Sequence, residues 1–186
     1  IGGGMSNVGQ RLGHYRIIEQ LGVGGMGEVY RARDERHGRD VVIRVLPARY
    51  SDDPVLLKGL ERDARAAAGL DHPNVVNVHG VGIHGGRPCV VTDLVEGRSL
   101  REAMDSRTLS NRQVIDIGSQ IASGLAAVHD AGVIQLGLNP SSVILTKDGV
   151  AKLCGIGSFD ADADREYASP EQIREGSGDQ RSDIFT

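Results

Sequence analysis

Residues 133–140 read Val-Ile-Gln-Leu-Gly-Leu-Asn-Pro, an apolar run that leads into a loop closed by Pro140. Before it, a helix is predicted over 110–131, because this segment begins with a capping box and carries apolar residues on one face. After it, short strands over 143–145 and 150–153 flank a Lys-Asp-Gly turn and predict a small hairpin. The quoted stretch is therefore a loop held between a core helix and a hairpin.

The first half of the chain predicts a sheet with one helix. Alternating or β-branched residues predict strands over 15–21, 28–33, 41–46, 75–81 and 89–93. Asp53 and Pro54 begin a helix that runs to about Gly69, since Asp is a good cap and Pro fits the first turn. A sheet half followed by a helical half indicates an α+β fold.

The composition excludes several classes of protein. The chain is 39% hydrophobic and 25% charged with a formal net charge of −4, so it offers no basic block for nucleic acid or anionic membranes. No apolar run approaches the roughly 20 residues of a membrane span. Cys89 and Cys154 lack metal-ligand spacing and are expected to be reduced thiols. We therefore expect a cytoplasmic protein, or the cytoplasmic part of a larger one.

The segment Gly22-Val23-Gly24-Gly25-Met26-Gly27 is a G-x-G-x-x-G followed by a predicted strand. A helix after these glycines would indicate a dinucleotide-binding unit, whereas a strand fits a loop that folds over nucleotide phosphates. Two interpretations stay open: a phosphate-binding loop, and a flexible hairpin turn without a ligand.

Taken in order, the motifs resemble a protein kinase of the bacterial Ser/Thr family. The matching segments are Val41-Val42-Ile43-Arg44 for Val-Ala-Ile-Lys, 70–76 for the entry into the fourth strand, Thr92 for the gatekeeper, 93–97 for the hinge, Ser169-Pro170-Glu171 for Ala-Pro-Glu, and 181–185 for the start of helix F.

The resemblance implies a bilobal, α+β, protein kinase-like fold. A five-stranded antiparallel N-lobe with helix C is expected over 11–92, and a hinge over 93–98. A truncated, mainly helical C-lobe is expected over 99–186, ending at the start of helix F. Residues 1–10 are expected to be an expression scar and a flexible N-terminus.

The family's catalytic positions are substituted. In place of His-Arg-Asp stand Gln135, Leu136 and Gly137, in place of the Lys stands Asn139, and the two metal-binding positions hold Ser142 and Gly155. Glycine can neither accept a proton nor bind a metal ion. We therefore expect a pseudokinase that is not an enzyme and has no catalytic residue and no metal.

The acids of the next segment do not change this expectation. Asp160, Asp162 and Asp164 alternate like the first ligands of a calcium loop, but Arg165 stands where that loop demands glycine. A solvated activation segment is the preferred interpretation.

The resemblance also implies a vestigial nucleotide pocket. Its residues would be Gly22, Gly24, Gly27, Val29, Val42, Arg44, Thr92, Leu94 and Ile144. Val42 replaces a small Ala beside the adenine ring, and such overpacking weakens binding. Arg44 and Asp63 would replace the family's Lys–Glu pair, either as a structural ion pair, which we favour, or with Arg44 on a phosphate. No cofactor is expected beyond weak ATP binding without Mg²⁺.

The expected function is a scaffold for protein interactions or an allosteric regulator in bacterial Ser/Thr phosphorylation signalling. The alternative is a nucleotide-binding sensor with weak, metal-independent ATP binding, and unconventional chemistry at the cleft is a third interpretation. The expected partner is a protein, either an active kinase or a phosphopeptide-binding protein. It would bind through the truncated C-lobe, which could also form a homodimer. Whether the chain is a fragment of a longer protein stays open.

Overall fold

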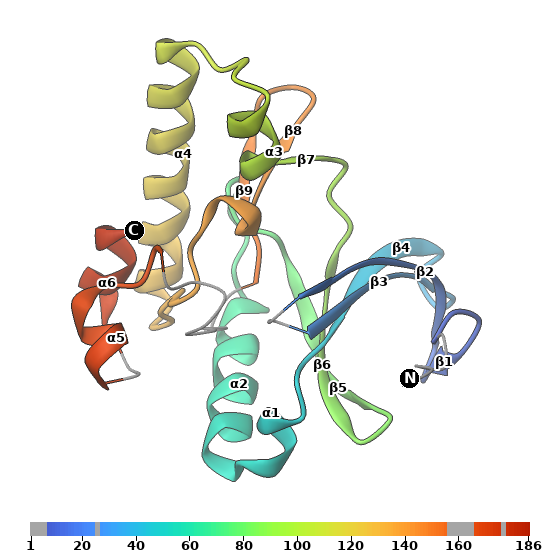
Figure 1. Ribbon diagram of the computed structural model, residues 1–186. Coiled ribbons are helices and arrows are strands. Elements are labelled where there is room, and N and C mark those ends of the chain that lie inside the picture. The colour runs from blue at the N-terminus through green and yellow to red at the C-terminus, as the bar shows by residue number, and fades with distance from the viewer. Residues whose placement is uncertain (1–6, 25–26, 156–165, 176–177) are drawn as a thin grey trace, which may run out of the picture.

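An antiparallel sheet and one long helix build the first half of the protein, and helices around a small second sheet build the other half (Figure 1). The computed structural model describes residues 7–24, 27–155, 166–175 and 178–186. The two-lobed α+β architecture is the one expected from the sequence. The expected activation-segment acids Asp160, Asp162 and Asp164 lie outside the described residues.

Six strands form the first sheet in the spatial order β1-β2-β3-β4-β6-β5, with antiparallel neighbours throughout. They are β1 (Arg11–Leu12), β2 (Tyr15–Gly24), β3 (Gly27–Asp34), β4 (Arg39–Val45), β5 (Val78–His84) and β6 (Arg87–Asp93). Five of them fall where strands were predicted, and β1 is an additional two-residue strand at the edge. The strand predicted from Val75 begins only at Val78, because Val75 instead forms a parallel bridge with Leu153 in the other lobe.

One helix covers one face of this sheet. After the single turn α1 (Arg49–Asp52), helix α2 (Pro54–Ala67) begins at Asp53, whose carboxylate accepts hydrogen bonds from the backbone nitrogens of Val55 and Leu56 at 2.8 and 3.3 Å. This confirms the predicted cap. The buried α2 residues Ala64 and Ala67 pack with Val78 of β5. The small alanine side chains let α2 lie close to the strands.

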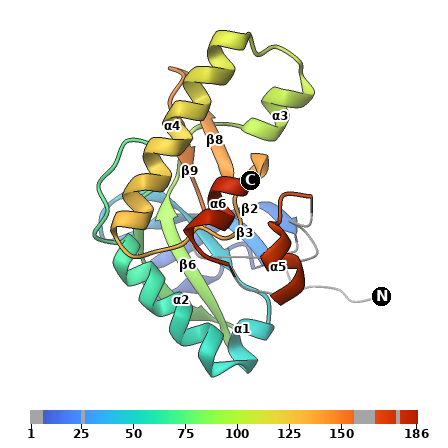
Figure 2. The same cartoon turned by 90° about the vertical axis from the view of Figure 1, so that its left-hand side faces the viewer.

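The second half is built around helix α4 (Asn111–Asp130), which begins with the predicted capping box of Ser110 and Gln113. The other elements are β7 (Gly97–Ser99), α3 (Leu100–Asp105), the 3₁₀ turn η1 (Pro140–Ser142), β8 (Val143–Thr146), β9 (Ala151–Leu153), α5 (Pro170–Glu175) and α6 (Gln180–Phe185). In Figure 2, α6 lies beside the C-terminal part of α4. Within the described residues, no helix is long and apolar enough to cross a membrane.

The buried face of α4 packs on the β8–β9 hairpin. Ile117, Leu125 and Val128 join Val143 and Leu153 in one apolar cluster. The first turn of this helix differs from the prediction, since Val114 is 54% exposed although it falls on the same helical face. The core therefore begins one turn later than the apolar pattern indicated.

Asn74 ties the segment after α2 to the second half. Its side-chain nitrogen donates to Oε1 of Gln120 on α4 and to the carbonyl oxygen of Ala151, both at 2.9 Å. The backbone nitrogen of Ala151 donates to the same Gln120 oxygen at 2.8 Å. Since Asn74 is buried, this closed set of hydrogen bonds fixes how the two lobes meet at their back.

The close approach at Asn74 predicts a strong effect of one glycine in α4. A Cβ at Gly124 would lie 2.8 Å from the carbonyl oxygen of Asn74 and 2.9 Å from Cδ1 of Leu153. Gly124→Ala should therefore lower the free energy of unfolding in urea by about 1–3 kcal/mol. Gly118→Ala in the same helix is the control, because a Cβ there meets no described atom within 4 Å. It should raise stability by up to about 1 kcal/mol, and a similar loss in both variants would contradict the packing described.

Candidate functional site in the cleft between the lobes

A cavity of about 350 Å³ lies between the sheet and the second lobe. This volume is within the range of small-molecule sites, which is about 300–1,000 Å³. The structure brings seven of the predicted pocket residues to its wall, namely Gly22, Val29, Val42, Arg44, Thr92, Leu94 and Ile144. Ile144 comes from β8 and faces residues of the sheet, so both lobes contribute apolar surface. The arrangement can enclose a flat apolar group such as a nucleobase.

A second hollow of about 450 Å³ adjoins this cavity and contains the other two predicted pocket residues, Gly24 and Gly27. Gly22, Val29 and Arg44 line both spaces. Across the hollow lie four substituted catalytic positions, which are Gly137, Asn139, Ser142 and Gly155. Residues predicted for the nucleotide pocket and residues at the substituted catalytic positions therefore line one hollow.

The predicted glycines have different structural roles. Gly27 has a φ of +99°, and a Cβ there would overlap the carbonyl oxygen of Val45, so the hairpin itself requires glycine at this position. At Gly22 and Gly24, an added Cβ would meet no described atom within 4 Å. These two glycines are thus not required for packing within the described chain, and they leave the backbone accessible to a ligand.

Asp183 fixes the loop that carries the substituted catalytic residues. Its side chain is 1% exposed, and the carboxylate accepts hydrogen bonds from Nε2 of His129 at 2.8 Å and from the backbone nitrogens of Gln135 and Leu136 at 2.8 and 2.7 Å. Leu136 takes a φ of +59°, which is uncommon for a bulky residue. Gln172 holds the same residue by donating to its carbonyl oxygen at 2.7 Å. Asp183 was not predicted as a functional residue, although it lies within the segment that resembled helix F.

The substituted side chains themselves make local contacts. Gln135 is fully buried and its Nε2 donates to the carbonyl oxygen of Cys154 at 3.0 Å. Asn139 caps the η1 turn by accepting hydrogen bonds from the backbone nitrogens of Ser141 and Ser142. The hydroxyl of Ser142 donates to the carbonyl oxygen of Asn139 at 2.9 Å. These polar groups stabilise the loop.

The metal ion implied by the family does not fit the residues at its two positions. Mg²⁺ in phosphoryl-transfer sites is held by one or two carboxylates together with phosphates. Ser142 offers a hydroxyl that already bonds Asn139, and Gly155 offers no side chain. These two positions therefore offer no carboxylate to a metal ion.

Arg44 points toward the floor of the cleft. A Cβ built on Gly155 would lie 3.5–3.6 Å from Nη1, Cζ and Nη2 of Arg44, so the guanidinium occupies the space beside the missing carboxylate. Arg44 is thus at the junction of the two hollows, where an anionic group of a ligand would lie.

The expected ion pair between Arg44 and Asp63 is not formed. Asp63 instead accepts hydrogen bonds from its neighbour Arg62, with Nε at 2.9 Å and Nη2 at 2.8 Å. The shorter Asp side chain stays with its own helix, because its carboxylate reaches Arg62 without crossing the gap to β4. Among the ion pairs of the described residues, Asp63 is paired with Arg62 and not with Arg44 as expected, while Arg44 lines the cleft.

Two residues that the sequence analysis did not single out also line the second hollow. Arg101 of α3 donates to the hydroxyl of Tyr167 at 2.5 Å, and its guanidinium carbon lies 5.5 Å from the centre of that ring. The contact joins α3 to the segment before α5. Arg101 adds a second cationic group to the rim of the hollow that holds Arg44.

The three hydrogen bonds of Asp183 predict a large loss of stability in Asp183→Ala. Removing one member of a buried charged contact costs about 3–5 kcal/mol, because the remaining donors lose their acceptor. Urea unfolding should show a loss in this range. Asp179→Ala removes the exposed cap of the same helix and should cost only about 1 kcal/mol. Equal losses would mean that the loop does not depend on Asp183.

The separation of Arg44 from Asp63 predicts additive effects in a double-mutant cycle. Asp63→Ala should lower the free energy of unfolding by no more than about 1 kcal/mol, as expected for a contact on one helix surface. The double variant with Arg44→Ala should lose the sum of the single losses to within about 0.5 kcal/mol. A larger coupling energy, measured by urea unfolding, would show that the two side chains meet in solution.

Comparison with known proteins identifies the family of this chain. The profile described as "Protein kinase domain" matches residues 15–186. Serine/threonine-protein kinase PknL of Mycobacterium bovis is 33% identical over 185 residues, with 92% of this chain and 46% of that protein covered. Serine/threonine-protein kinase PrkC of Bacillus subtilis is 30% identical over 192 residues, with 96% of this chain and 30% of that protein covered.

The fold has a matching solved structure. The crystal structure of the Mycobacterium tuberculosis PknI kinase domain superposes with a TM-score of 0.78 at 27% identity, covering 94% of this chain and 71% of that one. This chain thus resembles most of a kinase domain, while it spans less than half the length of the two curated relatives named above.

These comparisons contradict the expectation that the chain is not an enzyme. Relatives at about 30–33% identity are named serine/threonine-protein kinases, which points to an enzyme, and nothing among them shows a catalytically dead protein. Phosphoryl transfer by this chain would draw its base and metal ligands from residues other than Gly137, Ser142 and Gly155. Since the profile covers nearly the whole sequence, this chain belongs to the protein kinase domain family, alongside the bacterial serine/threonine kinases.

Proposed function

We propose that this chain is a nucleotide-responsive regulator in bacterial Ser/Thr phosphorylation signalling, acting through contacts with other proteins. The observation that carries the proposal is the cleft, where apolar walls from both lobes surround a cavity of about 350 Å³. A ligand in this cavity touches β8 and the sheet at once. Its binding therefore favours one arrangement of the lobes over others, which is the requirement for allosteric control.

The proposed ligand is ATP bound weakly and without Mg²⁺. Val29, Leu94 and Ile144 would hold the base, and Gly22 and Gly24 would leave room for phosphates. Arg44, whose guanidinium lies beside Gly155, would supply the positive charge that a metal ion supplies in the family. Val42 limits the affinity, because its two additional methyl groups face the same cavity as the base.

The proposed partners are proteins, either an active kinase or a phosphopeptide-binding protein. Ile173 on α5 and Ile184 and Phe185 on α6 are between 55% and 75% exposed. Apolar side chains of this size on adjacent helices favour contact with another protein or a second copy of the chain. The scaffold role rests on this surface, and the regulatory role rests on the cleft.

The proposal predicts ATP binding that does not depend on Mg²⁺. Calorimetry should give a dissociation constant no tighter than about 100 µM, close to −5.5 kcal/mol, and the same value to within about twofold with Mg²⁺ or with a chelator. Val42→Ala should tighten binding by about tenfold, since relief of overpacking is worth about 1–3 kcal/mol. Val55→Ala is the matched control, because Val55 is exposed on α2 and does not line the cavity.

Hydrogen exchange tests whether ATP binding changes the second lobe, as a regulator requires, or only the cleft. With saturating ATP, protection should change in the loop over 133–140 and in α5 as well as in the cleft, because ligand contacts from both lobes shift the arrangement of the second lobe. Absence of binding, or micromolar binding that requires Mg²⁺, would contradict the proposed ligand. Binding with changes confined to the cleft would contradict the regulatory role.

A further inference from the structure

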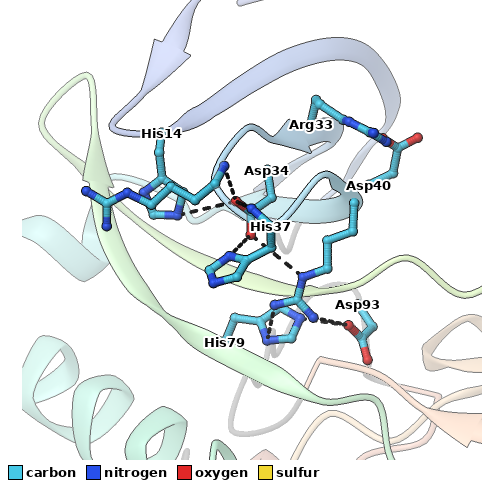
Figure 3. A network of polar contacts seen from close by, with 9 residues as sticks. His14, Arg33, Asp34, His37, Asp40, His79 and Asp93 are labelled. Carbon is cyan, nitrogen blue, oxygen red and sulfur yellow. Dashed lines mark hydrogen bonds and ion pairs between the residues drawn. The ribbon is translucent and has the colours of Figure 1, made fainter.

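Three potential metal ligands meet at the outer edge of the sheet, among the turns of the first four strands. His14 lies in the turn between β1 and β2, Asp34 ends β3, and His37 lies in the turn before β4. Their ligand atoms all lie within 4.8 Å of one another, and Figure 3 shows both imidazoles directed at the same carboxylate. None of the three residues lines the cavity between the lobes.

The distances are close to those of a metal-binding set. Nε2 of His14 lies 3.7 Å from Oδ1 of Asp34, and Nδ1 of His37 lies 2.8 Å from Oδ2. Donor atoms bound tetrahedrally at about 2.0–2.1 Å from a zinc ion are roughly 3.3 Å apart, a spacing that lies between the two His–Asp distances. The two imidazoles, whose ring centres are 6.4 Å apart, would move toward each other on binding. The three side chains also differ in their exposure to solvent. The Asp34 side chain is 1% exposed, whereas those of His14 and His37 are 27% and 63% exposed, so the ion would enter from solvent over the imidazoles.

Backbone hydrogen bonds fix the orientation of the Asp34 carboxylate, as a metal ligand requires. The backbone nitrogens of Arg36 and His37 donate to its Oδ1 at 3.0 and 3.1 Å, which fixes the carboxylate at the base of the cluster. The His37 ring also contacts this carboxylate, with Nδ1 at 2.8 Å from Oδ2.

Arg39 would compete with a metal ion for the Asp34 carboxylate. Nε of Arg39 lies 3.7 Å from Oδ2 of Asp34, and Arg36 is in the same turn. The Arg39 guanidinium is shared, however, because Nη1 also lies 3.5 Å from Asp93 and Nη2 lies 3.2 Å from Nδ1 of His79. Arg39 therefore keeps its contacts with Asp93 and His79 when an ion binds the Asp34 carboxylate. This competition lowers the affinity and favours ions that bond strongly to imidazole over Mg²⁺ or Ca²⁺.

We propose that His14, Asp34 and His37 form a binding site for a divalent transition-metal ion of the imidazole-preferring class, such as Zn²⁺, with at least one position open to water. Three protein ligands from two His and one carboxylate leave a tetrahedral ion one free position. The site is independent of the proposed nucleotide function, because it lies on other residues. Its expected consequence is stabilisation of the two turns that the three ligands join.

Titration of the whole chain with Zn²⁺, followed by calorimetry, tests the site directly. We expect one bound ion per chain and a rise in the melting temperature, with no response to Mg²⁺. His14→Ala and His37→Ala should each weaken binding by at least about tenfold, since each removes one ligand. His84→Ala is the control, because His84 ends β5 and is not one of the three clustered ligands. Co²⁺ should give visible absorption bands in the parent chain and in the control, but not in the other two variants.

Several outcomes would overturn the site. Absence of Zn²⁺ binding, or binding that both His14→Ala and His37→Ala retain, would mean that the cluster is only a hydrogen-bonded turn. Equal weakening in His84→Ala would place the ion elsewhere. The melting temperature of each variant without metal shows whether it folds, and if one variant does not fold, the other decides.

Discussion

The buried carboxylate of Asp183 determines the shape of the loop over 133–140. It accepts three hydrogen bonds, two of them from the loop backbone, and it lies on α6 while the loop follows α4. Because two of these donors are the backbone nitrogens of residues 135 and 136, this contact does not require the family's side chains at those two positions. Gln135 and Gly137 therefore occupy a kinase-like loop without supplying the family's catalytic groups. The backbone of this loop is thus held by contacts that the substitutions leave in place.

The cleft likewise keeps its apolar walls although residues around it are substituted. Its apolar walls need only residues of suitable size on β3, β4 and β8, and Val29, Val42 and Ile144 meet that need. The charge distribution has changed more than the shape, because Gly155 brings no carboxylate and the Arg44 guanidinium lies beside it. The cleft is lined by Arg44 and Arg101 and also by the carboxylates of Asp93 and Glu166, but the family's two metal positions carry no carboxylate. The proposal of nucleotide binding that does not depend on Mg²⁺ rests on the substitution of those two positions.

Local signals in the sequence were sufficient for most of the fold. The caps at Asp53 and Ser110 and the alternating strands are set by residues close in sequence, and the structure has them where they were predicted. Strand β7 was missed because Gly97–Ser99 becomes a strand only by pairing with β8. The prediction of an Arg44–Asp63 ion pair was wrong because the pair depends on the distance between α2 and β4, which no local sequence pattern encodes. The expectation about enzymatic activity failed for a related reason, since three substituted positions were taken to decide the activity of a family whose named relatives are kinases.

Arg39 connects the two regions of interest in the first lobe. Its guanidinium lies between Asp34, at the outer turn, and Asp93, which ends β6 and lines the cavity between the lobes. Asp93 is also bonded by His79 at 2.7 Å, so it does not depend on Arg39 alone. The Arg39 side chain is 43% exposed and its contacts with the two carboxylates are 3.7 and 3.5 Å long, so water screens both of them. The proposed metal site and the proposed nucleotide site can therefore act independently, although Arg39 contacts a residue of each.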